Sequence, residues 1–158
     1  MKTKVFALII VMAAFMTPTL KAQNNTADRI IGYYITFDDD TKAEKSQVQI
    51  FKTDNKYYGK IVWLKEPNKN GKPKVDDKNP DKALINRPVL GLLILTSFVY
   101  NPKNTEWSDG KIYDPQTGKT YRCYIKFEND TKLKVRGFIG TALLGKTVYW
   151  TKESALRK

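Results

Sequence analysis

The stretch from Trp107 to Gly140 constrains the fold more than any other part of the chain. It contains two turn sequences, and in the first of them Pro115 and Gly118 supply the backbone angles that a tight turn needs. The second, residues 128–131, also consists of turn-forming residues. Between the turns polar and apolar side chains alternate, and the apolar face is formed by Tyr121, Cys123, Ile125 and Phe127. Alternation of this kind is typical of a half-buried antiparallel strand, so the stretch predicts three strands joined by hairpins.

Similar patterns elsewhere predict eight strands and no long helix. The expected strands are Ile30–Phe37, Ser46–Lys52, Tyr57–Leu64, Val89–Tyr100, Thr105–Asp114, Lys119–Glu128, Lys132–Ile139 and Lys146–Lys152. Short, evenly spaced strands with turn signals are typical of a sandwich or a barrel. We expect an all-β fold in which a single eight-stranded antiparallel up-and-down barrel leaves no sheet edge and can enclose one small ligand.

The alternation also predicts which side chains share a face. In the third strand, Trp63 is expected on the same side as Tyr57 and Ile61. The segment Val89–Tyr100 is the most apolar after residue 22, and we expect it to be buried on both faces. In the first strand, one face is expected to consist of Ile31, Tyr33, Ile35 and Phe37, and to line the interior.

The first residues have the layout of a secretory signal peptide. Lys2 and Lys4 precede an apolar run from Val5 to Phe15, and a more polar region ends at Ala22. The apolar run is short for a membrane span, although an uncleaved N-terminal anchor is the alternative. We expect cleavage near Ala22, a single barrel domain over residues 23–158, and a periplasmic or secreted protein.

The sequence contains no histidine and one cysteine. These counts exclude nucleophile–histidine pairs, histidine-ligated zinc and an internal disulfide. Any catalysis would have to use carboxylates, Lys, Tyr or Arg, and we expect no catalytic residue, no cofactor and no metal site. The three carboxylates of residues 38–40 lack the spacing of a calcium loop, so they are interpreted as a hairpin tip.

The net charge of the whole chain is +12, and removing Lys2, Lys4 and Lys21 with the signal peptide leaves about +9. Such a charge favours anionic partners, which outside the cytoplasm are lipid head groups, acidic glycans or cell-wall polymers rather than nucleic acid. The alternative is a solvated surface of scattered lysines. Beyond the signal peptide we expect no transmembrane span, and we expect a monomer.

The segment from Glu66 to Arg87 is polar and contains almost no apolar residues. It predicts a long surface loop, and loops of this length in compact domains are usually functional or mobile. A loop placed in this way can cover one mouth of the barrel.

Two arginines and four aromatic residues are the candidate ligand-binding side chains. Arg136 lies beside Gly137, and its guanidinium can bind a phosphate or carboxylate, or form an ion pair with Asp114. Arg87 binds an anion or holds the end of the long loop. Aromatic side chains can either fill the core or line a pocket mouth, and the candidates for the pocket are Tyr34, Trp63, Tyr113 and Tyr121.

Several sequence elements together resemble the domain-of-unknown-function 2147 family of secreted bacterial proteins. They are Gly32–Thr36, Gly59–Val62, Arg87–Gly91, Gly110–Pro115, Gly118–Tyr121, Leu133–Gly140 and Trp150. The resemblance implies a lipocalin-like barrel in the periplasm and no settled reaction. The signal sequence resembles those of Bacteroidetes. Many members of the family have Trp at the position of Tyr34 and a cysteine pair in the long loop, which this chain lacks.

Two functions are consistent with these observations. The first is a small binding module that holds an apolar or amphipathic, lipid-like ligand inside the barrel. The second is a non-enzymatic envelope protein, structural or stress-related, that contacts an anionic envelope polymer through its basic surface. An enzyme is the least favoured class because histidine is absent and no spaced pair of acids is recognisable.

Overall fold

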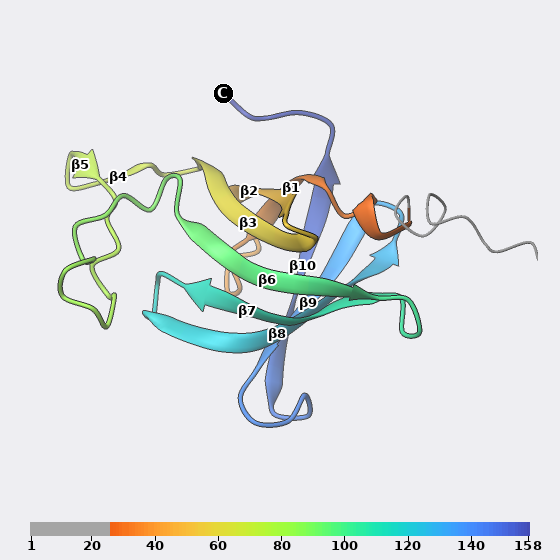
Figure 1. The fold of residues 1–158 in the computed structure, drawn as a ribbon. Helices are drawn as coiled ribbons and strands as arrows, with labels where there is room; N and C mark the ends of the chain where they lie inside the picture. The colour runs from red at the N-terminus through yellow and green to blue at the C-terminus, as the bar shows by residue number, and fades with distance from the viewer. Residues whose placement is uncertain (1–25) are drawn as a thin grey trace, which may run out of the picture.

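The computed structural model describes residues 26–158, whose eight long strands form one closed antiparallel barrel (Figure 1). Around the barrel the strands follow the order β1-β10-β9-β8-β7-β6-β3-β2, and β2 pairs with β1. This arrangement confirms the predicted all-β barrel and excludes a sandwich. The predicted signal peptide lies outside the described residues. The barrel strands are β1 (Gly32–Phe37), β2 (Glu44–Thr53), β3 (Lys56–Leu64), β6 (Leu93–Asn101), β7 (Glu106–Asp114), β8 (Lys119–Asn129), β9 (Lys132–Phe138) and β10 (Gly145–Glu153).

The two ends of the barrel differ in their connections. At one end, here called the closed end, β2–β3, β6–β7 and β8–β9 are joined by short turns. The β2–β3 turn has positive φ at Asp54 (49°) and Asn55 (60°), which is the geometry of a two-residue hairpin loop. At the other end, the open end, lie residues 38–43, 65–92, 115–118 and 139–144.

The chain segment before β1 seals the closed end. Residues 26–28 form one helical turn, and the side chains of Ala27 and Ile30 are buried inside the barrel. The indole of Trp107 donates a hydrogen bond to the carbonyl of Ala27 (3.1 Å), and the hydroxyl of Tyr34 donates one to the carbonyl of Ile30 (2.9 Å). The hydroxyl of Tyr57 donates to the carboxylate of Asp28 (2.5 Å). These bonds satisfy polar groups that would otherwise be costly to bury.

A cluster of large side chains fills the closed half of the interior. Trp107 is fully buried, and its ring lies 5.0 Å from that of Tyr100, 5.8 Å from Phe127 and 6.2 Å from Tyr57, centroid to centroid. Gly110 leaves room for the ring of Phe98, because a Cβ at Gly110 would lie 2.4 Å from ring atoms. This half of the barrel is therefore solid.

Three of the predicted faces are wrong, because β-bulges and the closing segment change which side chains point inward. The β2–β3 register skips a residue between Val48↔Ile61 and Gln47↔Trp63, so Trp63 turns to the outer surface. In β1 the inward side chains are Tyr34 and Thr36, whereas Ile31 is exposed. Of the predicted face only Phe37, beyond the register shift after Thr36, lines the cavity. The segment Val89–Tyr100 becomes a strand only at Leu93, and Leu93 and Val99 are exposed, so it is not buried on both faces.

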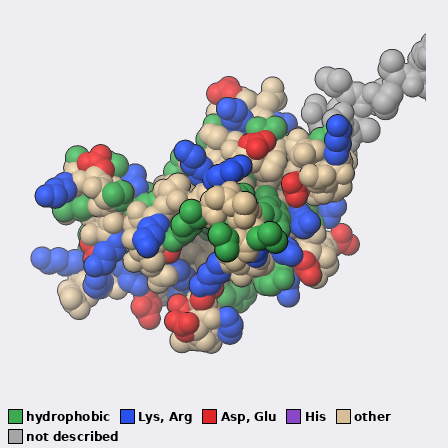
Figure 2. Space-filling view, turned by 90° about the horizontal axis from the view of Figure 1, so that it is seen from below, with side chains coloured by type: hydrophobic (Ala, Val, Ile, Leu, Met, Phe, Trp, Pro, Cys, Tyr) green, Lys and Arg blue, Asp and Glu red, His purple; other side chains and the backbone are tan. Residues whose placement is uncertain are grey.

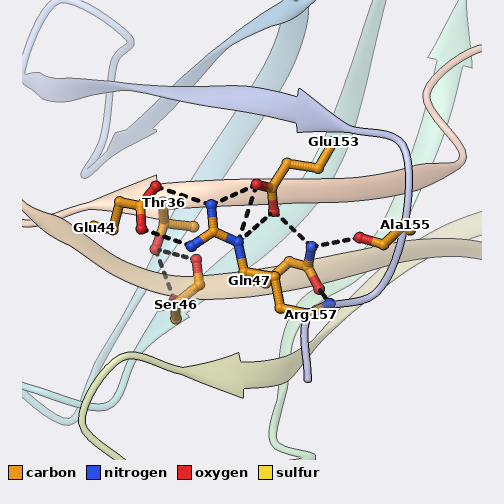
Figure 3. Close-up of polar contacts among 7 residues, drawn as sticks. All are labelled: Thr36, Glu44, Ser46, Gln47, Glu153, Ala155 and Arg157. Atoms are coloured by element: carbon orange, nitrogen blue, oxygen red, sulfur yellow. Dashed lines mark hydrogen bonds and ion pairs between the residues drawn. The ribbon is translucent and has the colours of Figure 1, made fainter.

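The C-terminal tail covers the outer face of β1 and β2 (Figure 3). The side chain of Gln47 is fully buried there and donates to Glu153 (2.6 Å) and to the carbonyl of Ala155 (2.9 Å). Arg157 forms two hydrogen bonds with the carboxylate of Glu44 (2.6 and 2.9 Å) and bonds with Glu153, and its guanidinium lies over the ring of Trp63. The tail therefore buries a polar side chain without leaving it unpaired.

The long loop, residues 65–92, projects from the side of the open end (Figure 1). It contains a small hairpin formed by β4 (Asn68–Lys69) and β5 (Lys72–Pro73). Its centre is the fully buried carboxylate of Asp76, which accepts hydrogen bonds from Arg87 (2.8 Å) and Asn79 (2.7 Å) of the loop and from Tyr113 (2.6 Å) of β7. These contacts hold the loop against the barrel wall.

Candidate ligand-binding cavity

The open half of the barrel contains a cavity of about 510 Å³. This volume lies in the range usual for small-molecule sites, roughly 300–1,000 Å³. The cavity wall is mostly aliphatic and aromatic, because the inward faces of β3, β6, β7, β9 and β10 meet there. Its apolar wall residues are Ile61, Ile94, Ile112, Val135, Val148 and Trp150.

A pair of buried hydroxyl groups forms the polar part of the inner wall. Thr36 and Ser46 face each other across β1 and β2, and their hydroxyl oxygens lie 2.7 Å apart. The Thr36 hydroxyl is also 3.1 Å from the carbonyl of Ser46, so it can donate there. Each hydroxyl keeps acceptor capacity. The wall therefore offers one polar point to a ligand within a surface that is otherwise apolar.

Charged residues surround the mouth and connect its loops. The ammonium group of Lys45 donates a hydrogen bond to the side-chain carbonyl of Gln116 (2.7 Å), which joins β2 to the β7–β8 turn. Lys146 of β10 pairs with Asp39 of the β1–β2 loop, and this contact raises the pKa of Lys146. The mouth thus carries both signs of charge and suits a polar or charged head group more than an apolar one.

Behind one side of the mouth, Tyr113 links the cavity wall to the long loop. Its ring lines the cavity, its hydroxyl bonds Asp76, and the guanidinium of Arg87 lies over its face at 5.6 Å. Burial raises the pKa of Asp76, but hydrogen bonds from Tyr113, Asn79 and Arg87 outweigh it and hold that pKa below its usual range. No residue of the long loop lines the cavity. The loop therefore supports the barrel wall, and the prediction that it covers the mouth is wrong.

The six sequence-predicted ligand-binding residues occupy five different environments. Tyr113 and Tyr121 line the cavity together. Tyr34 lies fully buried in the closed half, where burial raises the pKa of its hydroxyl. Trp63 lies on the outer face beneath Arg157, and Arg87 holds the long loop through Asp76.

Arg136 points away from the cavity toward the β9–β10 loop. Its guanidinium donates to the carbonyls of Ala142 (2.7 Å) and Leu143 (3.2 Å) and to the hydroxyl of Thr147 (2.8 Å). Of the two predicted alternatives, the ion pair with Asp114 is not formed, because these three hydrogen-bond partners of Arg136 are neutral oxygens. The Asp114 carboxylate instead accepts bonds within its own turn, from the backbone amide of Gln116 (3.0 Å) and the hydroxyl of Thr117 (2.9 Å). Arg136 is nevertheless held in place, by neutral oxygens.

The sequence interpretation missed several residues that shape this site. Thr36 and Ser46 gave no signal because a hydroxyl group on a strand is compatible with either face. Asp76 lies in a segment rich in Lys, Asp and Asn, where a single buried carboxylate looks like its exposed neighbours. Leu143 and Leu144 could have been noticed in the sequence, because two adjacent leucines between Gly140 and Gly145 are unusual at the tip of a hairpin loop.

The cysteine found in residues 26–158 is buried in the core. Burial raises the pKa of the Cys123 thiol to about 12, so it is protonated at neutral pH and packs as a small apolar side chain. In the described part of the chain, no three acidic or cysteine side chains gather as they would around a metal ion. Across residues 26–158, no helix is both long and apolar enough to cross a membrane.

The closed barrel with one sealed end and one open cavity defines a lipocalin-like protein. A solved structure, described as protein HP1028 from the human pathogen Helicobacter pylori and as belonging to the lipocalin family, is similar to this chain with a TM-score of 0.68. The two sequences are 26% identical, and the match covers 78% of this chain and 82% of that one.

The family model described as an uncharacterized protein conserved in bacteria, DUF2147, matches residues 32–152. The chain therefore belongs to this family, as its motifs predicted. The matched region begins at β1 and ends within β10, so it includes every strand of the barrel. A comparison with curated proteins finds no match.

Proposed function

We propose that this protein binds one small amphipathic molecule in the cavity, with the apolar part inside the barrel and the polar part at the mouth. The observation that carries the proposal is the division of the interior. Large side chains fill the closed half, while the open half keeps about 510 Å³ lined by branched aliphatic and aromatic side chains. An empty apolar space of this size sacrifices packing that a purely structural barrel would gain.

The distribution of polar groups supports an amphipathic ligand over a purely apolar one. The hydroxyls of Thr36 and Ser46 and the charged residues of the mouth lie at the edges of an apolar wall. Burying about ten methylene groups contributes roughly 8 kcal/mol before the entropy costs of binding. We therefore expect a Kd of about 1 µM or weaker for a single-chain lipid.

The test is a titration of tryptophan fluorescence with saturated fatty acids and lysophosphatidylcholine. Trp150 lines the cavity, whereas Trp107 is fully buried below it and Trp63 is outside, so an entering ligand changes chiefly the emission of Trp150. Val148→Phe narrows the cavity beside Trp150 and is expected to weaken binding at least tenfold. Val99→Phe, on the exposed outer face of β6, is the matched control and is expected to leave binding unchanged.

Two results together would refute the proposal. The fluorescence change would fail to saturate with a fatty acid or lysolipid of any acyl-chain length, and an organic extract of the purified protein would contain no lipid. These results would favour the envelope protein that contacts an anionic polymer. Equal effects of Val148→Phe and Val99→Phe would show that the ligand binds outside the cavity.

We also propose that the protein is exported and acts in the periplasm or beyond it, with processing near Ala22. The support is the signal-like start of the sequence, with two lysines before an apolar run. N-terminal sequencing of protein from a periplasmic extract tests this, and a periplasmic form that still begins at Met1 contradicts the predicted cleavage.

A further inference from the structure

The loop between β9 and β10, residues 139–144, carries the three most exposed large hydrophobic side chains of residues 26–158. Leu143 is 88% exposed, Leu144 74% and Ile139 67%. A single exposed leucine needs no explanation, but three in one short loop form a continuous apolar tip. Leu144 and Ile139 also lie at the rim of the cavity.

Arg136 holds this tip in its projecting conformation. Its guanidinium binds the carbonyls of Ala142 and Leu143 from the barrel side, and the amide of Leu144 donates to the carbonyl of Thr141 (3.0 Å). Gly140, with φ of 70°, allows the sharp bend at the start of the loop. These bonds fix the backbone of the loop, so that Leu143 is left almost fully exposed and Leu144 is left mostly exposed at the rim of the cavity.

The same contacts prepare the tip for an apolar environment. A backbone carbonyl that enters lipid without a hydrogen-bond partner costs several kcal/mol. The carbonyls of Thr141, Ala142 and Leu143 already have partners within the loop and its base. The loop can therefore insert its apolar side chains with these three carbonyls already paired.

The base of the loop is positively charged. Arg136 contacts only neutral oxygens, and Arg122 donates to the carbonyl of Gly140 (3.4 Å) and lies over the ring of Phe138. Neither arginine forms an ion pair within residues 26–158, whereas the nearby Lys146 is paired with Asp39. The sequence from Lys132 to Lys152 contains no acidic residue. Figure 2 looks onto the side bearing this loop, where hydrophobic side chains gather near the centre with Lys and Arg around them.

We propose that the β9–β10 loop docks the barrel onto an anionic lipid surface. In this arrangement the leucines enter the boundary between head groups and acyl chains, and the arginines meet lipid phosphates, which is how peripheral proteins combine apolar and basic contacts. A second copy of the chain is a poorer occupant, because joining two such faces brings unpaired arginines together. Docking through this loop sets the cavity mouth, rimmed by Leu144, against the lipid.

The test is sedimentation with vesicles. It uses the full protein purified from the cells that express it, without further truncation. Vesicles of equal parts phosphatidylglycerol and phosphatidylcholine are compared with vesicles of phosphatidylcholine alone. Leu143→Asn removes the most exposed leucine without changing charge, and Leu143 does not line the cavity. Leu156→Asn, at a half-exposed leucine of the C-terminal tail, is the matched control.

We expect the parent protein to bind the anionic vesicles and to bind neutral ones much more weakly. Leu143→Asn should weaken binding to anionic vesicles about tenfold, because burial of a leucine contributes that order of affinity, and Leu156→Asn should not. No binding to anionic vesicles, or equal losses in the two variants, would overturn the proposal. A dimer in vesicle-free buffer that Leu143→Asn converts to a monomer would identify a second copy as the partner instead. Because Leu143 lies outside the cavity, ligand titration of the same variant reports separately on the proposed binding function.

Discussion

The two halves of the barrel interior are built from the same strands but packed in opposite ways. In the closed half, Trp107, Tyr34 and Phe98 interlock beneath the sealing segment of residues 26–31. In the open half, the same strands present branched aliphatic and aromatic residues that leave a cavity between them. The closed half thus provides the stability that lets the open half remain empty.

The two ends also differ in what holds their loops. Apolar burial and buried hydrogen bonds hold the closed end, whereas polar contacts at Asp76, Lys45 and Lys146 hold the loops of the open end. Apolar packing is indifferent to pH, but a carboxylate is not. The comparison therefore predicts large volume effects in the closed half and pH-dependent effects where a carboxylate takes part, at Asp76 of the open end and at Asp28 of the closed end.

The largest effect is expected for Trp107→Ala. Removing this fully buried indole should lower the free energy of unfolding by about 3–5 kcal/mol, because it leaves a cavity in packed surroundings and removes the bond to Ala27. Urea denaturation measures it. Trp63→Ala on the outer face is the control, and a loss at Trp107 no greater than at Trp63 would show that the closed half is not the stabilising part.

Asp76→Asn should lower the free energy of unfolding by about 1.5–3 kcal/mol at neutral pH, because three hydrogen bonds to a buried carboxylate are weakened. The folded-state pKa of Asp76 is depressed, so its contribution is present above the unfolded pKa of about 3.9 and is lost as pH falls through the folded value. Denaturation of parent and variant between neutral and acid pH should show a stability gap that narrows below about pH 4. If the difference in unfolding free energy between parent and variant stayed constant with pH, the destabilisation would come from the changed shape of the side chain and not from its lost charge.

Gly110→Ala should cost about 1–3 kcal/mol, because its Cβ would lie 2.4 Å from the ring of Phe98 in a half that has no free space. Gly137→Ala is the matched substitution in the open half. There the Cβ would lie 3.3 Å from Ile112, a side chain that borders the cavity and can move into it. Thermal unfolding measures the Tm of the two variants. Equal shifts in Tm would contradict the proposed difference in packing between the closed and the open half.

The smallest effect is expected for Val148→Leu, which adds a methylene to the cavity wall. Its free energy of unfolding should change by less than about 0.5 kcal/mol, whereas Val48→Leu in the packed interior should cost about 1–3 kcal/mol. Chemical denaturation of the pair checks this. A substantial cost at Val148 would indicate that the cavity collapses in solution.

The sequence alone determined the fold class and most strand positions. In β8 the alternation of Tyr121, Cys123 and Ile125 with polar neighbours predicted both the strand and its inward face, because a regular strand has a side-chain period of two. The family motifs agreed with this reading, and the turn at Asp114 was predicted from residue types whose local hydrogen bonds decide the conformation.

Only the tertiary structure decided which side chains make the site. A one-residue bulge sent Trp63 outward, and sealing by residues 26–31 drew Tyr34 into the core; neither effect is encoded in the local pattern of one strand. Asp76 became buried only because Tyr113, remote in sequence, reached its carboxylate. Whether the interior was solid or open depended on how side chains from all eight strands met at one level of the barrel, which is a sum of long-range contacts.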